Sequence, residues 1–275
     1  MQVGDIIVRK SYHKDMKFNI ISIQNHQAIL NALNYRLIAD APLDDLEVVD
    51  TRLFNSQKLF KIAKRNVKKA PTTPKLLKDY PYYKTTSHNK EMKCGRILHL
   101  DGNILYFKKC CSLYKKLNLT VDAYCIEECY QAQFIPQLLQ IHQPDILIIT
   151  GHDAMVQNKR KSSSLLEYKN SQFFVESVQT ARKINRNYDD LVIFAGGCQS
   201  NYEELMNAGA NFASSPNRTL LNIYDPVYVA TIVATTSITK VVDLNVLLDS
   251  GLFLDTDIGG LETRGKSRLI KPSYI

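Results

Sequence analysis

The sequence predicts an α/β protein in which a doubly wound, mostly parallel sheet follows a small β-barrel. Short apolar runs separated by polar turns occupy residues 1–50, a pattern typical of antiparallel strands. Continuous apolar runs alternate with amphipathic stretches over residues 94–275, as expected for parallel strands buried on both faces with helices between them. A strongly basic segment, residues 51–93, separates these two parts.

The first part has the pattern of a small SH3-like β-barrel. Its apolar runs lie near residues 3–8, 18–23, 28–30 and 36–39, and polar turns separate them. Regularly repeated short strands favour an antiparallel sheet that closes on itself. We expect this domain to act in folding or docking rather than to hold a ligand.

The basic segment carries all of the chain's excess positive charge. Residues 51–93 hold 12 Lys and Arg against 2 Asp and Glu, whereas the whole chain has a formal net charge of +8. Lys and Arg recur at helical spacing over residues 58–69, and Pro71 and Pro74 then interrupt the pattern. We predict a basic helix followed by a linker. Because the rest of the chain is close to neutral, the charge pattern excludes a uniformly basic nucleic-acid binder.

The third part, residues 94–275, alternates strand and helix patterns. The predicted strands are 97–100, 121–126, 146–149, 191–195 and 211–213, and the predicted helices are 103–117, 128–142, 165–188, 200–208 and 224–235. In such an open sheet the functional site lies at the carboxyl ends of the strands. The tail from residue 243 has no clear pattern.

The composition excludes several other classes of protein. The chain is 45% hydrophobic and 23% charged, which is typical neither of a disordered nor of a membrane protein. It has no apolar run of about 18 residues, and its N-terminus has no apolar signal region. The 6 cysteines are too sparse for a disulfide scaffold, so we expect reduced thiols in a cytosol-like compartment.

Two residues with catalytic chemistry follow consecutive apolar strands. His152 comes after the strand ending at Thr150, and Cys198 comes after the strand ending at Gly196. Only one helical stretch separates the two strands, so we expect them to be neighbours in the sheet. Neighbouring strands lie about 4.8 Å apart. The two side chains are therefore expected at the same edge, within reach of each other.

The surroundings of Cys198 favour a reactive thiol. A helix is predicted to begin at Ser200, where Ser200 and Glu203 form a capping-box pattern, and a helix N-terminus lowers the pKa of a nearby thiol. His152 would act as the general base. The backbone around Gly151 and Gly197 would bind the oxyanion. The sequence indicates no third group that would orient His152.

Each of these residues also has a purely structural interpretation. A cysteine after a buried strand is commonly a small core residue, and a single histidine is commonly hydrogen-bonded or exposed. Zinc would need closer ligand spacing than Cys125 and Cys129 provide, so we predict no metal and no cofactor. The basic loop 158–164 is expected to be solvated, although its place after His152 also suits a substrate gate.

The sequence resembles the YabG family of sporulation-specific cysteine proteases over nearly its whole length. The blocks that carry the resemblance are VGDIIVRKSYHKD, RLIADAPLDDL, RILHLDG, PDILIITGHDA and FAGGCQSNYEELMNAGANFASSPNR. The resemblance implies that His152 and Cys198 are the catalytic pair. It also implies limited proteolysis of spore-coat and cortex-associated proteins, in the cytoplasm of the mother cell or in the spore coat.

The pattern of the two strands resembles more distantly the caspase-like peptidases, including clostripain. In those proteins a His-Gly and a Cys each end a strand, whereas here Asp153 follows His152. Several of them prefer a basic residue before the cleaved bond, which would require an acidic pocket. The candidates for that pocket are Asp153, Asp225, Asp255 and Asp257.

We therefore predict a cysteine endopeptidase with a Cys198–His152 dyad and protein substrates of the spore coat and cortex. We expect no membrane association and no nucleic-acid partner, and the basic segment is a candidate site of self-cleavage. The alternative is a non-enzymatic protein that binds RNA or acidic coat surfaces through the barrel and the basic segment. Binding that is sensitive to salt and survives Cys198→Ala would favour this alternative.

Overall fold

The computed structural model describes residues 1–49, 80–87, 91–155, 164–245 and 258–270. The chain divides into two compact units, Met1–Val67 and Lys68–Ile275. Of the predicted basic helix and linker, 51–93, residues 51–79 and 88–90 lie outside the described residues, as does residue 50. Among the helices that the structure describes, none has the length and apolar composition needed to cross a membrane.

The first unit is a five-stranded antiparallel sheet in the order β4-β3-β2-β1-β5. Its strands are β1 (Ile6–Arg9), β2 (Lys17–Gln24), β3 (Gln27–Ala32), β4 (Ile38–Pro42) and β5 (Leu46–Val48), with 3-10 turns η1 (Lys10–Tyr12) and η2 (Leu43–Asp45). Ile7, Phe18, Ile20, Leu30 and Leu46 form its buried core. The antiparallel prediction is confirmed, while the SH3-like barrel stays a prediction.

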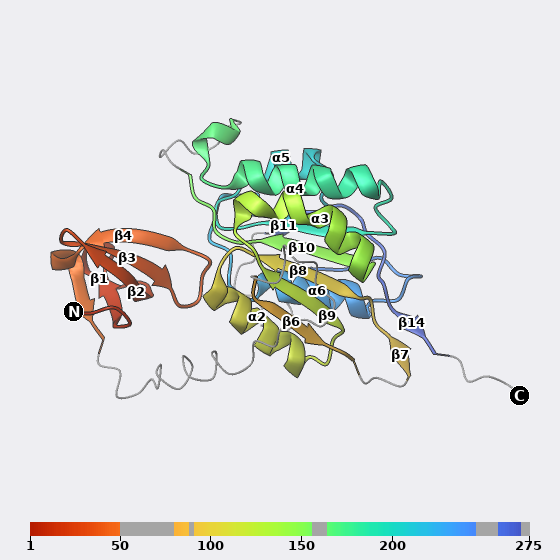
Figure 1. Cartoon of the computed structure of the whole chain (residues 1–275), viewed down its shortest axis with the longest axis horizontal. Coiled ribbons are helices and arrows are strands. Elements are labelled where there is room, and N and C mark those ends of the chain that lie inside the picture. The colour runs from red at the N-terminus through yellow and green to blue at the C-terminus, as the bar shows by residue number, and fades with distance from the viewer. Residues whose placement is uncertain (50–79, 88–90, 156–163, 246–257, 271–275) are drawn as a thin grey trace, which may run out of the picture. The chain divides into compact units, whose positions relative to one another are not determined.

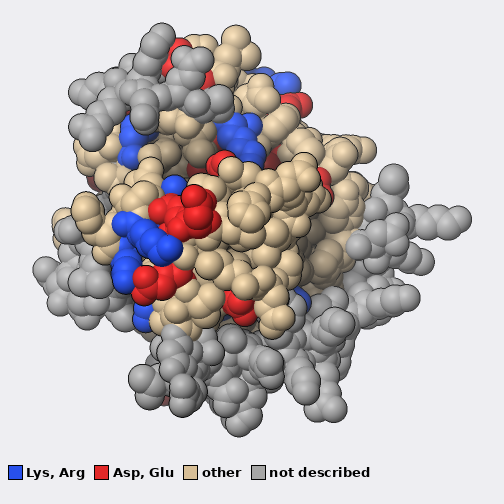
Figure 2. All heavy atoms as spheres, turned by 90° about the vertical axis from the view of Figure 1, so that its left-hand side faces the viewer, with Lys and Arg blue, Asp and Glu red and all other residues tan. Residues whose placement is uncertain are grey.

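Two basic side chains of this unit pair with acidic ones. Lys14 Nζ lies 2.7 Å from Glu47 Oε1, and Arg9 Nε lies 3.1 Å from Asp45 Oδ2. Figure 2 likewise shows basic and acidic side chains next to one another on the face that it presents. In the described part of this unit, Lys14 and Arg9 are thus each neutralised by a nearby carboxylate.

The second unit is built on a seven-stranded, mostly parallel sheet (Figure 1). The strand order is β13-β12-β11-β10-β8-β9-β6, and β6 and β13 at the two edges are antiparallel to their neighbours. The strands are β6 (Tyr82–Thr85), β8 (Ile97–Asp101), β9 (Val121–Cys125), β10 (Ile146–Thr150), β11 (Val192–Gly196), β12 (Phe212–Ser214) and β13 (Ile258–Gly260). A separate pair joins β7 (Met92–Lys93) to β14 (Arg268–Leu269).

Helices cover both faces of this sheet, as the sequence predicted. Figure 1 shows α3 (Glu128–His142), α4 (Ser171–Ile184) and α5 (Tyr202–Asn207) on one face, with α2 (Ile104–Lys116) and α6 (Asp225–Thr235) on the other. β8 lies between β9 and β10 in the sheet. The chain passes from β8 to β9 on one side of it and then crosses to β10 on its other side, so the direction of winding reverses at β8. The mixed α/β class with a mostly parallel sheet is confirmed, whereas the caspase-like fold stays a prediction.

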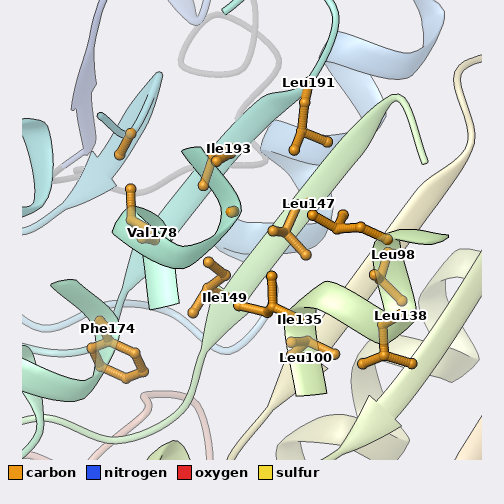
Figure 3. Close-up of a cluster of buried hydrophobic side chains, with 14 of the residues drawn as sticks. Leu98, Leu100, Ile135, Leu138, Leu147, Ile149, Phe174, Val178, Leu191 and Ile193 are labelled. Atoms are coloured by element: carbon orange, nitrogen blue, oxygen red, sulfur yellow. The ribbon is translucent and has the colours of Figure 1, made fainter. Parts of the chain in front are cut away.

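The main core lies between the sheet and the layer of α3 and α4. Figure 3 shows Leu98, Leu100, Leu147, Ile149 and Ile193 of the strands facing helix residues. Those helix residues are Ile135, Leu138, Phe174 and Val178. Because successive strand residues point to opposite faces, the residues between these leucines and isoleucines point toward α2 and α6.

Several predicted boundaries shift by one or two residues, and two larger differences concern a helix and an edge strand. The predicted helix 165–188 begins instead at Ser171 and ends at Ile184, and Leu165–Glu167 forms a separate 3-10 turn, η5. Asn170 stays outside the helix because its backbone N–H donates to Asp153 and its amide donates to the carbonyl of His152. The second difference is β6, which lies in the segment predicted as linker and pairs with β9 along the sheet edge.

Candidate active site

The two predicted strand ends meet at the carboxyl edge of the sheet. β10 lies between β8 and β11, with Thr150 paired to Asp101 on one side and to Gly196 on the other. His152 and Cys198 each follow the Thr150–Gly196 pair by two residues. The prediction that these strands are neighbours is therefore confirmed, and the two residues leave the sheet at equivalent positions.

Glu128, the first residue of α3, holds His152 in place. Its Oε1 accepts a hydrogen bond from the backbone N–H of His152 at 2.7 Å and lies 3.4 Å from the ring Nδ1. His152 is only 8% exposed. A carboxylate on Nδ1 is the usual arrangement by which a catalytic histidine is oriented and its protonated form stabilised. Glu128 thus contacts both the backbone and the ring of His152, a partner that the sequence pattern did not indicate.

Asn103 contacts the other ring nitrogen of His152. Its Nδ2 lies 3.0 Å from Nε2, while its Oδ1 accepts the backbone N–H groups of Leu105 and Tyr106 at the start of α2. These two hydrogen bonds fix the orientation of the amide, so Nδ2 is the donor to Nε2. His152 is therefore assigned as the tautomer with a proton on Nδ1 and a lone pair on Nε2, the form that accepts a proton as a base.

The glycines before Asn103 and His152 make room for Glu128. A Cβ at Gly102 or at Gly151 would overlap the carboxylate of Glu128. The carboxylate therefore lies over two backbone segments that follow neighbouring strands. This packing explains Gly151 without the oxyanion role predicted for it.

Cys198 lies next to Leu221 and is shielded from solvent. Its Sγ accepts the backbone N–H of Leu221 at 3.2 Å and lies 3.6 Å from the Leu221 carbonyl oxygen. The exposed fraction of Cys198 is 0%. In this arrangement the thiol is covered and contacts the backbone of Leu221.

Gly197 brings the Cys198 and His152 loops into contact. A Cβ there would lie 3.0 Å from both the Gly151 carbonyl oxygen and the Asp153 backbone nitrogen, so no larger residue fits without displacing the backbone. The N–H of Gly197 donates to Ser200 Oγ at 2.8 Å. That N–H already has an acceptor, which disfavours the oxyanion role predicted for Gly197.

Asp153 is a buried structural carboxylate in this structure. Its Oδ1 accepts backbone N–H groups of Ala154 and Asn170, and its Oδ2 accepts the hydroxyls of Ser171 and Ser200. Burial raises the pKa of Asp153, although these hydrogen bonds oppose the shift. Both carboxylate oxygens thus already accept two hydrogen bonds each within the protein, which disfavours an ion pair between Asp153 and a basic residue of a substrate.

Ser200 therefore does not form the predicted capping box. Asn201 caps α5 instead, because its side chain accepts the backbone N–H of Glu204 at 3.2 Å. The hydroxyl of Ser200 instead accepts the backbone N–H of Gly197 and donates to Asp153. Ser200 therefore links the two loops that carry the candidate dyad.

The other acidic candidates fall in different places. Asp225 opens α6 and is 4% exposed, and its Oδ2 accepts the backbone N–H of Asn222 at 2.8 Å. It follows Leu221, the neighbour of Cys198, by four residues. Asp255 and Asp257 lie outside the described residues.

The two residues that contact the ring of His152, neither of them a sequence-predicted site residue, share one signal. Asn103 and Glu128 each begin a helix directly after a strand of the sheet, at the same edge as His152. Polar residues at such strand-to-helix turns are candidates for a site in any doubly wound sheet. The pattern alone could not select these two from the other polar turn residues.

Comparison with known proteins supports a peptidase. The family model described as YabG peptidase U57 matches residues 2–272. A curated relative, the sporulation-specific protease YabG of Bacillus subtilis (strain 168), is 39% identical over 98% of this chain and 98% of its own length. The similarity thus extends through both units and includes the edge of the sheet with His152 and Cys198.

Proposed function

This chain belongs to the YabG peptidase U57 family, and we propose that it is a cysteine endopeptidase with Cys198 as nucleophile and His152 as base. The observation that carries the proposal is the equivalent position of the two residues. Each lies two residues beyond a paired position of neighbouring parallel strands, and Gly197 packs on the backbone of Gly151 and Asp153.

In the proposed reaction, Nε2 of His152 takes the proton of the Cys198 thiol. The thiolate then attacks the carbonyl carbon of the substrate peptide, forming a tetrahedral intermediate. The imidazolium returns its proton to the leaving amine as the C–N bond breaks. Water, activated by the neutral His152, hydrolyses the thioester and regenerates the thiol. The carboxylate of Glu128 stabilises the imidazolium in both steps.

This sequence of steps requires two contacts to open first. Cys198 must leave Leu221, and Nε2 of His152 must exchange its contact with Asn103 for the thiol. We propose that a bound substrate displaces the segment around Leu221. The described arrangement is then the resting form of the site, in which the thiol is protected from oxidants.

We further propose that the substrates are proteins of the spore coat and cortex, cleaved in the mother cell or in the spore layers. The name of the Bacillus subtilis relative, a sporulation-specific protease, supports this setting. A preference for basic residues would make the Lys- and Arg-rich segment 51–93 a site of self-cleavage. Of the two described acidic candidates for such a preference, Asp153 has both oxygens hydrogen-bonded within the protein, and Asp225 lies four residues after Leu221, the neighbour of Cys198.

The test compares Cys198→Ala and His152→Ala with the control Cys129→Ala, which changes an exposed cysteine of α3. Each dyad variant of the full chain should lose cleavage of a coat-protein substrate on the order of 10³-fold or more. Circular dichroism and the melting temperature should match those of the wild type. Undiminished cleavage by folded Cys198→Ala would refute the dyad.

A further inference from the structure

A second cluster of potential ligand atoms lies beneath the sheet, on the face covered by α2. His99 and Asp101 of β8 and Cys110 of α2 each offer one ligand atom, and these atoms all lie within 4.8 Å of one another. The exposed fractions are 0% for His99, 0% for Asp101 and 1% for Cys110. Such a combination of nitrogen, oxygen and sulfur donors in a closed interior is typical of transition-metal ligands.

The fold brings these three residues together by simple geometry. His99 and Asp101 are two residues apart in β8, so both side chains point to the face opposite Leu98 and Leu100. The chain then turns at Asn103 and α2 packs back against that face. Cys110 is on the buried side of α2 and so meets the two strand residues.

The distance between the side-chain atoms of His99 and Asp101 is closer to that between two ligands of one ion than to that of a direct hydrogen bond. Nε2 of His99 lies 3.5 Å from Oδ2 of Asp101. A charge-assisted N–H···O bond is about 2.7–2.9 Å long. Ligand bonds of about 2.0–2.1 Å at tetrahedral angles place nitrogen and oxygen about 3.3–3.4 Å apart. The two atoms are thus almost at the spacing that a zinc ion imposes.

The ring of His99 is oriented from its other side. Its Nδ1 lies 2.9 Å from the hydroxyl of Tyr114, one turn of α2 beyond Cys110. A hydrogen bond on the second ring nitrogen is the usual way in which a ligating histidine is held and its tautomer selected. With Nδ1 facing Tyr114, Nε2 faces Asp101.

The charge of the cluster also favours a cation. Asp101 is a fully buried carboxylate, and burying an ionised carboxylate is costly unless a positive charge compensates it. The thiol of Cys110 lies 3.4 Å from the carbonyl oxygen of Ile223. On metal binding this thiol would lose its proton to solvent, and the thiolate would bond to the ion in place of the carbonyl contact.

We propose that Nε2 of His99, Oδ2 of Asp101 and Sγ of Cys110 bind a Zn²⁺ ion. The mixed nitrogen, oxygen and sulfur set matches zinc, and not Mg²⁺ or Ca²⁺, which prefer oxygen ligands alone. Cys125, the pairing partner of Asp101 on β9, points to the same face of the sheet, but it is not among the three residues whose ligand atoms lie within 4.8 Å of one another. This proposal differs from the expectation, based on cysteine spacing alone, that no metal is bound.

The site would stabilise the turn that carries part of the candidate active site. Oδ1 of Asp101 accepts the backbone N–H of Asn103 at 3.0 Å, and Asn103 contacts His152. The ion would therefore join β8 to α2 and fix the position of Asn103. Its role is structural, and no step of the proposed proteolysis passes through it.

The test measures metal content and a cobalt spectrum on the full chain, neither of which depends on proteolysis. Wild-type protein purified without chelator should contain about one zinc per chain by mass spectrometry. Cys110→Ser and His99→Gln should lower the zinc content at least tenfold, whereas the exposed control Cys129→Ser should keep it. Replacement by Co²⁺ should give a thiolate-to-cobalt charge-transfer band that is missing in Cys110→Ser.

Two results would overturn the proposal. The first is the finding that wild-type protein contains no zinc and shows no charge-transfer band when it is titrated with Co²⁺. This measurement uses the wild type alone, so it does not depend on whether a variant folds. The other is a folded Cys110→Ser variant with the zinc content and cobalt spectrum of the wild type. A chelator should also lower the melting temperature of both the wild type and the inactive Cys198→Ala variant. Because the variant lacks the proposed nucleophile, this result would test the zinc site independently of the dyad.

Discussion

Oε1 of Glu128 contacts His152 twice, accepting its backbone N–H at 2.7 Å and lying 3.4 Å from its ring Nδ1. The two residues come from different parts of the fold, the start of α3 and the end of β10. Gly102 and Gly151 leave the space in which the carboxylate lies. One side chain thereby fixes both the backbone position and the ring orientation of the proposed base.

Glu128→Gln should lower kcat on the order of 10²-fold with little change in KM. The amide still accepts the backbone N–H of His152, but it carries no charge to stabilise the imidazolium. Steady-state kinetics on a peptide substrate measure this effect, with Glu127→Gln, an exposed neighbour, as the control. Wild-type kcat in the Gln variant would exclude an electrostatic role for Glu128.

Asn103 combines a structural role with a positioning role, and two substitutions separate them. Asn103→Ala removes the cap of α2 and should cost about 1 kcal/mol of unfolding free energy. Asn103→Asp keeps a capping oxygen but replaces the donor to Nε2 of His152 by an acceptor. An acceptor favours a proton on Nε2, which leaves no lone pair there to take the thiol proton, so kcat should fall while stability stays near wild type. Thermal unfolding and kinetics measure the two effects. Full activity in a stable Asp variant would contradict the positioning role.

Gly151→Ala should destabilise the protein by about 1–3 kcal/mol, because its Cβ would overlap the carboxylate of Glu128. The double variant with Glu128→Ala removes that overlap. The sum of the two single effects should therefore exceed the effect of the double variant, which a double-mutant cycle of unfolding free energies measures. Additive effects would show that the two residues do not contact each other.

Cys198 should react more slowly than Cys129 with a thiol reagent in the folded protein. Cys198 is 0% exposed and contacts Leu221, whereas Cys129 is an exposed residue of α3. Labelling followed by mass spectrometry gives both rates, and unfolding in urea should make them similar. Faster labelling of Cys198 in the folded chain would mean that the Leu221 contact is open in solution.

Asp122 should make the stability of the second unit depend on pH. Burial acts to raise the pKa of Asp122, but its hydrogen bonds with His142 and Tyr82 outweigh burial and lower the pKa. His142 Nδ1 lies 3.3 Å from Asp122 Oδ2, and Tyr82 is on the edge strand β6. A lowered pKa in the folded state stabilises the protein above the ordinary carboxyl pKa, near 4.

That stabilisation should be lost as the pH falls through the lowered pKa of the folded state. Urea unfolding of the wild type and of Asp122→Asn should differ most above about pH 5 and converge toward pH 3. A difference in unfolding free energy that does not change with pH would show that the charge of Asp122 contributes nothing.

Much of the second unit followed from hydrophobic periodicity. The five parallel strands and the start and end of α3 were predicted because buried strands and amphipathic helices have distinct repeats. The helix predicted over 165–188 was too long, since periodicity does not register that Asn170 is bonded to His152 and Asp153. Strand β6 was missed because a short edge strand has little periodicity of its own.

Hydrophobic periodicity was enough to predict the order of strands and helices and the two strand ends that carry His152 and Cys198. The groups that contact these two residues became visible only in the fold: Glu128 and Asn103 on the histidine, and Leu221 on the cysteine. These partners lie 23 to 49 positions away along the chain. Contacts between residues so far apart in the chain depend on how the connections between parallel strands place the helix ends at the edge of the sheet. A pattern of neighbouring residues carries no information about that placement.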